Sequence, residues 1–240
     1  MRRGGDSKRL LMERSKTMNS VQRLDHRRRG ESAREKGQQR RWDSFTDWAR
    51  VQAAGILMPI ARAMGRLGIH PNMITILGML LQFGVAIVFG LGYVKLGGWL
   101  LLAVAPVDAL DGALARALDE QSRFGSFLDS TLDRFSDAAL ILGLTVHYMS
   151  QGVHLEVALL LLSLVAAMMV SYTRARAEAL GFSCKVGVLT RLERIVLIAA
   201  LSAIGLPTVM IWALAVLSVF TVLQRIFHVY AASRLEDAGD

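Results

Sequence analysis

The 240-residue chain contains one cysteine, Cys184, and four prolines. A single cysteine excludes a framework of internal disulfides. Aromatic residues make up only 7% of the chain, and residues 1–41 contain none. This segment therefore lacks the stacking side chains typical of single-stranded nucleic-acid binding, and we expect no nucleic-acid partner. The first apolar run long enough to span a membrane begins near residue 73, so we expect no cleavable signal peptide.

Hydrophobic residues make up 53% of the sequence, and the mean hydropathy is +0.39. This composition is typical of a polytopic membrane protein. Residues 1–50 carry 15 Lys/Arg and 7 Asp/Glu, whereas the remainder carries 13 of each, so the excess positive charge is N-terminal. A basic segment beside a membrane favours anionic lipids by about 1 kcal/mol per residue. A disordered, solubilising tail is the alternative interpretation.

The pattern divides the chain into four parts. We expect a basic, disordered cytoplasmic tail at 1–41, an amphipathic interfacial helix at 42–68, a six-helix membrane domain at 69–232 and a short cytoplasmic tail at 233–240. The amphipathic helix is predicted because apolar residues, including Trp42 and Trp48, alternate with charged ones; Pro59 would kink it.

Six apolar segments predict an all-α fold with six transmembrane helices, at residues 73–91, 99–118, 125–149, 155–179, 192–206 and 207–232. Asn72 is expected as the N-cap of the first, or Pro71 as part of its first turn. Residues 95–98 (Lys-Leu-Gly-Gly) are predicted to form the turn before the second helix.

The placement of Lys and Arg predicts the topology. With the N-terminus inside, the outward connections near 92–98, 150–154 and 205–208 contain one basic residue, Lys95. We therefore expect an integral protein of the cytoplasmic membrane, with both termini in the cytoplasm and the acidic residues described next facing it.

Four carboxylates interrupt the second and third apolar segments: Asp108, Asp111, Asp129 and Asp133. Each pair, at i,i+3 or i,i+4, lies on one helical face. An acid at the centre of a spanning helix costs about 2.5–3.5 kcal/mol, so four acids need a shared cation. Carboxylate oxygens suit Mg²⁺ or Mn²⁺. Salt-bridged structural acids, or the ion path of a divalent-cation transporter, are the alternatives.

The acids belong to a longer pattern. It reads Asp108-x-x-Asp111-Gly112-x-x-Ala115-Arg116, eight residues, then Gly125-x-x-x-Asp129-x-x-x-Asp133. This arrangement resembles the full signature of the CDP-alcohol phosphotransferase family. The resemblance implies a homodimeric enzyme that transfers a phosphatidyl group from CDP-diacylglycerol to an alcohol and releases CMP. It also implies two divalent ions held by the four acids, with Asp133 as the base that takes the acceptor's proton.

The same resemblance implies a site for the CDP-lipid. The residues concerned are Gly112, Arg116 and Ser122, together with Pro71, Asn72, Met73, Ile74 and Thr75. Independently of the family, the unpaired N–H groups at the start of a helix suit a phosphate.

A second polar cluster consists of Ser171, Arg174, Arg191, Arg194 and Arg225. The positive-inside rule, by which Lys and Arg collect on the cytoplasmic side of the membrane, explains some of these arginines. Several arginines within spans also fit an anionic acceptor bound through its phosphate. The local sequences S-Y-x-R-A-R-A-E and T-R-L-E-R resemble the phosphatidylinositol-phosphate synthase branch, which implies inositol 1-phosphate as acceptor. Glycerol 3-phosphate, the acceptor of a phosphatidylglycerophosphate synthase, is the alternative. Asp137 continues the acidic face and is expected to pair with Arg134 or another cation.

Overall fold

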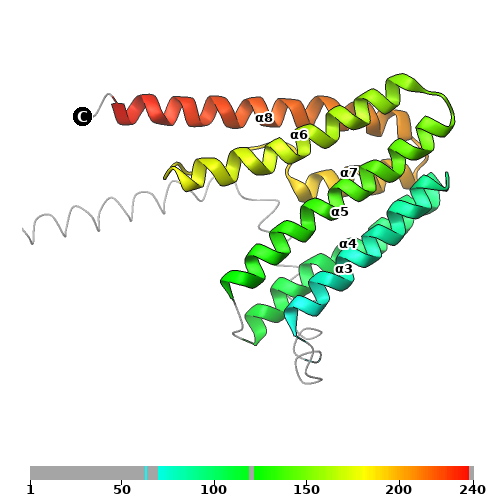
Figure 1. Ribbon diagram of the computed structural model, residues 1–240, viewed down its shortest axis with the longest axis horizontal. Coiled ribbons are helices and arrows are strands. Elements are labelled where there is room, and N and C mark those ends of the chain that lie inside the picture. The colour runs from blue at the N-terminus through cyan, green and yellow to red at the C-terminus, as the bar shows by residue number, and fades with distance from the viewer. Residues whose placement is uncertain (1–62, 64–69, 119–121, 238–240) are drawn as a thin grey trace, which may run out of the picture. The chain divides into compact units, whose positions relative to one another are not determined.

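The computed structural model describes residue 63, residues 70–118 and residues 122–237, and every regular element in these ranges is an α-helix. The predicted all-α fold is therefore confirmed for this part of the chain. The helices are α3 (Pro71–Gly90), α4 (Val94–Ala117), α5 (Arg123–Ser150), α6 (His154–Ala179), α7 (Arg191–Ala203) and α8 (Pro207–Asp237) (Figure 1). The predicted tail 1–41 and, apart from Ala63, the predicted helix 42–68 lie outside the described residues.

Three of the six helices are long and apolar enough to cross a membrane. They are α3, α6 and the Pro207–Leu235 part of α8, with mean hydropathies of 2.2, 2.1 and 2.0 over their most apolar windows. In α4, the apolar stretch Val94–Val107 is shorter. The six helices occupy the six predicted positions, whereas the number that span the membrane stays a prediction.

The start of α3 decides between the two expected caps. His70 is the N-cap, because its Nδ1 accepts a hydrogen bond from the backbone N–H of Asn72 at 3.2 Å. Pro71 is the first helical residue, where its lack of an N–H costs nothing. The prediction that Pro71 belongs to the first turn is confirmed, and the prediction of Asn72 as N-cap is wrong.

The turn predicted at residues 95–98 is also wrong, because α4 already begins at Val94. The chain reverses at Gly92, whose φ of 90° favours glycine. The two glycines of the predicted turn, Gly97 and Gly98, instead lie within α4 and permit close packing. A Cβ on Gly97 would lie 2.5 Å from the Phe89 ring, and a Cβ on Gly98 would lie 2.8 Å from the carbonyl oxygen of Ala199 on α7.

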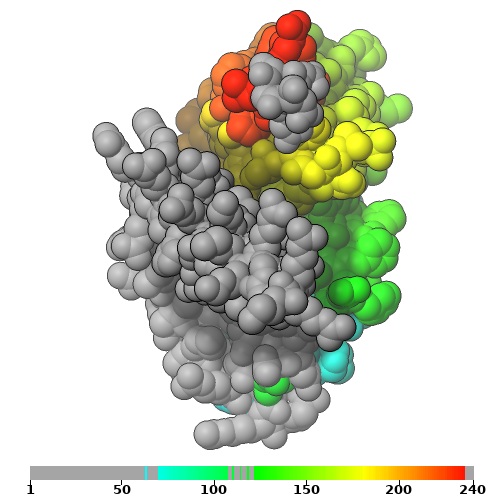
Figure 2. Space-filling view, turned by 90° about the vertical axis from the view of Figure 1, so that its left-hand side faces the viewer, coloured from blue at the N-terminus to red at the C-terminus, as the bar shows by residue number. Residues whose placement is uncertain are grey.

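The main packing contacts link the helices in a closed ring. Around it, α3 packs on α5, α5 on α6, α6 on α8, α8 on α7, α7 on α4, and α4 on α3. Both views show α6 beside α8 (Figures 1 and 2). The apolar centre includes Phe89, Leu101, Leu144, Ile198 and Leu214, each at most 1% exposed and contributed by five different helices.

We expect Gly98→Ala to lower thermal stability, because the added methyl would meet backbone atoms of α7 that cannot rotate away. Overpacking of this kind costs about 1–3 kcal/mol, or a fall in Tm of roughly 3–10 °C. Gly84→Ala is the matched control, since a Cβ there would meet nothing within 4 Å. Thermal unfolding of both purified variants in detergent would check this. Equal Tm values would contradict the close contact between α4 and α7.

Candidate functional site

Helix α5 carries three acids at four-residue intervals, so they share one face. Its start is fixed by Ser122, whose Oγ accepts a hydrogen bond from the Gly125 N–H at 2.8 Å. Asp129 and Asp133 are partly buried, whereas the Asp137 side chain is only 3% exposed. The face therefore runs from a more accessible end at Asp129 to a buried end at Asp137.

The structure places the other expected metal ligands and two expected nucleotide contacts on α4. Asp108, Asp111, Gly112 and Arg116 lie within this helix, and their side chains lie outside what the structure describes. Among the side chains that are described, no group of three or more His, Cys, Asp or Glu forms a metal site. The predicted four-acid cluster stays a prediction, although its all-carboxylate donor set fits hard divalent cations.

The start of α3 meets the start of α5. A Cβ on Gly125 would lie 2.9 Å from Ser122 Oγ and 3.2 Å from Asn72 Oδ1, so a larger residue would crowd both side chains. Pro71 and Ile74 are buried, whereas the Met73 side chain is 61% exposed. Thr75 donates a hydrogen bond to the Pro71 carbonyl oxygen at 3.3 Å. Of the expected CDP-lipid contacts, the structure thus brings Asn72 and Ser122 together.

All five residues of the second predicted cluster line a single cavity of about 210 Å³. Its lining consists of Asp133, Arg134, Asp137, Val170, Ser171, Arg174, Thr190, Arg191, Arg194 and Arg225. These residues come from α5, α6, α7 and α8, and from the loop before α7. Five arginines and two aspartates give the lining a formal charge of +3. A positive cavity lined by forked guanidinium donors suits a phosphate monoester.

The local sequence T-R-L-E-R sets the direction of the two α7 arginines. Thr190 and Glu193 form a capping box, with the Thr190 N–H donating to Glu193 Oε2 at 3.0 Å. The cap fixes the helix start at Arg191, so Arg191 and Arg194, three residues apart, face the same side. That side is occupied by the acids of α5.

Ion pairs join α7 to α5. Arg191 Nη2 lies 2.9 Å from Asp133 Oδ1, and its Nε lies 3.7 Å from Asp137 Oδ1. Arg194 Nη2 donates to Asp137 Oδ2, and the Arg194 side chain is only 1% exposed. Its Nε and Nη1 are buried without a hydrogen-bond partner among the described residues. Because buried donors without partners are costly, these two N–H groups indicate a place for an anion.

The remaining arginines of the cavity differ in how firmly they are held. Arg225 donates from Nε to the Val186 carbonyl at 2.9 Å and from Nη1 to the Val170 carbonyl. It therefore ties α8 to α6 and to the loop before α7. Arg174 instead pairs with Glu178 at 2.8 Å, and both side chains are about half exposed.

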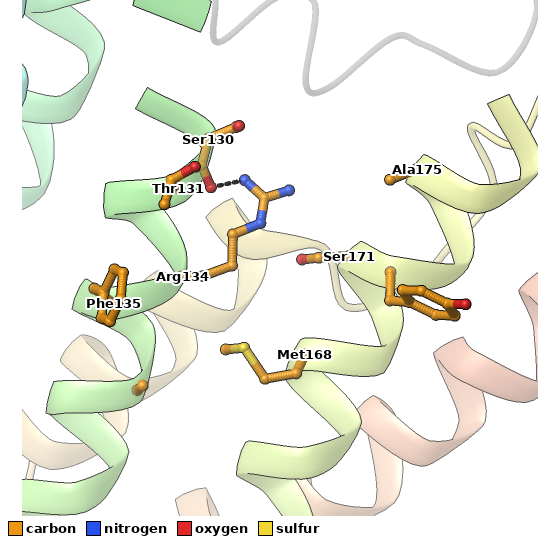
Figure 3. A pocket seen from close by; sticks show the side chains of 9 residues that line it. Ser130, Thr131, Arg134, Phe135, Met168, Ser171 and Ala175 are labelled. Carbon is orange, nitrogen blue, oxygen red and sulfur yellow. Dashed lines mark hydrogen bonds between the residues drawn. The ribbon is translucent and has the colours of Figure 1, made fainter. Parts of the chain in front are cut away.

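A second cavity, of about 480 Å³, lies between α5 and α6 and adjoins the first. Arg134 and Ser171 line both cavities. Figure 3 shows the side chains of Arg134, Ser171 and Met168 turned toward the space between the two helices. Arg134 donates to the Ser130 carbonyl on its own helix, rather than to Asp137. Asp137 was expected to pair with Arg134 or with another cation. It pairs with two other cations, Arg194 and Arg191.

Comparison with known proteins identifies the family. The sequence model described as CDP-alcohol phosphatidyltransferase matches residues 68–224, which include the four acids and most of the arginine cavity. The chain belongs to the CDP-alcohol phosphatidyltransferase family. The resemblance noted from the signature is thereby confirmed.

Two named relatives are similar over most of the chain. Archaetidylinositol phosphate synthase of Pyrococcus horikoshii is 39% identical over 178 residues, which cover 74% of this chain and 91% of the relative. Phosphatidylinositol phosphate synthase of Cutibacterium acnes is 38% identical over 165 residues, covering 68% of this chain and 77% of the relative.

Solved structures of phosphatidylinositol phosphate synthase from Mycobacterium tuberculosis share the fold at 34% identity. The form with CDP-DAG bound superposes with a TM-score of 0.69 and covers 73% of this chain and 94% of its own. The form in complex with manganese and citrate has a TM-score of 0.68 and covers 72% of this chain and 88% of its own.

Sequence reasoning missed the cavity roles of Asp137 and Arg134. A signal for Asp137 was present, because an acid about four turns into a largely apolar helix requires a buried cation, and Arg191 and Arg194 were available. Nothing in the sequence alone indicated that Arg134 would lie between two cavities.

We expect Arg225→Gln to lower Tm on the order of 5–10 °C, because one buried and one partly buried carbonyl lose a charged donor. Arg174→Gln is the matched comparison, since its exposed i,i+4 pair is worth about 0.3–0.5 kcal/mol, or less than about 2 °C. Thermal unfolding would separate the two. An unchanged Tm in Arg225→Gln would show that Arg225 does not anchor the loop.

Proposed function

We propose that this chain transfers the phosphatidyl group of CDP-diacylglycerol to a hydroxyl of inositol 1-phosphate and releases CMP. The observation that carries the proposal is the arginine cavity, where two buried donors of Arg194, which have no hydrogen-bond partner among the described residues, share a lining with Asp133. Family membership supplies the reaction type, and relatives named as phosphatidylinositol or archaetidylinositol phosphate synthases support the acceptor.

The acceptor phosphate would bind to Arg194 Nε and Nη1, the two donors for which the described residues offer no hydrogen-bond partner. Ser171, Arg174, Arg191 and Arg225 would complete the site, since all line the same cavity. A dianionic phosphate offsets most of the formal +3 charge of the lining. Binding through the phosphate would leave the ring hydroxyls of the acceptor free to approach Asp133.

Asp133 is the proposed general base. An acceptor hydroxyl oxygen would attack the phosphorus that bears the diacylglycerol, its proton would pass to Asp133, and the bond from that phosphorus to the oxygen of CMP would break. Asp133 lies beside the cavity and pairs with Arg191 at 2.9 Å, so it already adjoins the proposed acceptor site. Arg191 would orient this carboxylate while the acceptor is bound.

The donor would bind at the other end of the acidic face. Asp108, Asp111, Asp129 and Asp133 would hold two divalent ions, Mg²⁺ or Mn²⁺, which supply charge neutralisation for the pyrophosphate. The form of the Mycobacterium tuberculosis enzyme in complex with manganese supports a divalent ion. The cytidine and its phosphates would be contacted by Gly112, Arg116 and Ser122 and by the helix start Pro71–Thr75, where the α3 and α5 starts meet.

The cellular setting follows from the charge distribution. We propose six spans in the cytoplasmic membrane, both termini in the cytoplasm and the site facing it, because Lys and Arg avoid the opposite connections. The basic N-terminal segment would bind anionic lipids. A homodimer is proposed from the family resemblance.

The reaction is tested by offering four acceptors separately to purified protein with CDP-diacylglycerol and Mg²⁺: inositol 1-phosphate, glycerol 3-phosphate, free inositol and serine. We expect CMP release with inositol 1-phosphate to be at least about tenfold faster than with free inositol, because free inositol brings no anion to the two buried Arg194 donors. A preference for glycerol 3-phosphate would identify a phosphatidylglycerophosphate synthase. The absence of CMP release, with Mn²⁺ uptake into vesicles, would support the transporter instead.

Asp133→Asn tests the proposed base. We expect kcat to fall about 10²–10⁴-fold, since the amide cannot accept the hydroxyl proton. Binding of CDP-diacylglycerol, measured as the rise in Tm that it causes, should be largely retained. Normal turnover in this variant would rule out Asp133 as the base.

A further inference from the structure

Asp137 has no role in the reaction as proposed above, yet it is among the most deeply buried charges in the described part of the chain. Its side chain is 3% exposed and lines the arginine cavity one turn beyond Asp133. A buried carboxylate costs several kcal/mol unless nearby charges and hydrogen bonds compensate it. An acid in a cavity suited to an anion therefore requires an explanation.

Within the described part of the chain, the hydrogen bond and ion pairs of Asp137 are made with the two arginines of α7. Its Oδ2 accepts from Arg194 Nη2, and among the described residues its Oδ1 has only the longer ion pair to Arg191 Nε, at 3.7 Å. A guanidinium group is planar and rigid, so holding one of its nitrogens restricts where the other two point. Asp137 thus fixes the orientation of Arg194 and leaves Nε and Nη1 for another ligand.

Asp137 also influences Arg191. That guanidinium lies between two carboxylates, 2.9 Å from Asp133 and 3.7 Å from Asp137. The charge of Asp137 draws Arg191 toward the buried end of the face and opposes its complete engagement by Asp133. A single carboxylate therefore positions both α7 arginines relative to the cavity.

We propose that Asp137 is a positioning residue for the acceptor, which acts through Arg194 and Arg191 without touching the substrate. The inference rests on the proposed function, because it assumes that the cavity binds the acceptor's phosphate. It differs from a general electrostatic role in the sign of its effect. Removing the negative charge raises the formal charge of the lining from +3 to +4, which by itself would tighten anion binding. Positioning predicts weaker binding.

The first test is Asp137→Asn, assayed for CMP release. The acceptor is varied at saturating CDP-diacylglycerol, and CDP-diacylglycerol is then varied at saturating acceptor. We expect the acceptor KM to rise about tenfold and the CDP-diacylglycerol KM to stay within about twofold. A lower or unchanged acceptor KM would overturn the proposal. An equal loss for both substrates would also overturn it, since that is the result of general damage to the fold.

Two further variants serve as controls. Glu178→Gln makes the same chemical change in an exposed acid paired with Arg174, and we expect its kinetics to stay within about twofold of the original. Asp137→Glu keeps the buried charge but moves the carboxylate by one methylene, and it replaces Asp137→Asn if that variant does not fold. We expect an acceptor KM about threefold higher, as small displacements of a positioned group are costly. An unchanged value would count against positioning.

A double-mutant cycle with Arg194→Lys shows whether Asp137 acts through Arg194. Lysine keeps the charge but loses the forked geometry, so the single variant Arg194→Lys should also have a raised acceptor KM. If the two residues act as a unit, the double variant will be no worse than the more impaired single variant. Multiplicative effects would overturn the proposal. Failure of the unmodified protein to release CMP with any phosphorylated acceptor would instead refute the proposed function, independently of Asp137.

Discussion

The ion pairs between α5 and α7 are the interactions on which the site depends. Helices built largely from apolar residues give charged side chains few places to go, and a buried charge is tolerated only beside an opposite one. Asp133 and Asp137 meet that requirement through Arg191 and Arg194. In the ring, α5 packs on α6 and α7 packs on α8. The cavity at these ion pairs is therefore also lined by Ser171 and Arg174 of α6 and by Arg225 of α8.

The packing around these pairs keeps them in place. The capping box of Thr190 and Glu193 sets the beginning of α7, and the close contact at Gly98 holds the other end of α7 against α4. Two residues of α8, Arg225 and Thr221, hold the loop before α7. Thr221 Oγ1 accepts a hydrogen bond from the Leu189 N–H at 3.0 Å, and Arg225 donates to the Val186 carbonyl. The site is thus supported by backbone contacts rather than by long, exposed side chains alone. Such support reduces the ordering required when a substrate binds.

Much of this arrangement could be predicted from the sequence. Apolar runs gave the positions of the six helices, and the residues later found to line one cavity were grouped before their contacts were known. The errors came from local backbone geometry. Residues 95–98 were expected to turn because glycines often do, but at Gly97 and Gly98 the missing side chain makes room for Phe89 and α7. His70 was not expected as a cap, because it is not among the common capping residues.

The partner of Asp137 could not be predicted for a different reason. Arg134 was close in sequence, whereas Arg194 is 57 residues away. Which cation reaches a buried acid depends on how helices pack, and helical periodicity gives only the face on which the acid lies. The side chains of Asp108 and Asp111 lie outside the described structure, so their grouping with Asp129 and Asp133 still rests on the family signature.

The shortness of α7 has a consequence for how a water-soluble acceptor reaches its site. With 13 residues the helix is about 20 Å long, whereas the hydrocarbon layer of a bilayer is about 30 Å thick. In the proposed topology Ala203 is near the outer boundary, so Arg191 begins the helix roughly 10 Å below the inner one. In that topology the water-soluble acceptor would have to reach a site below the level of the lipid headgroups, whereas the lipid product could leave by moving sideways into the bilayer.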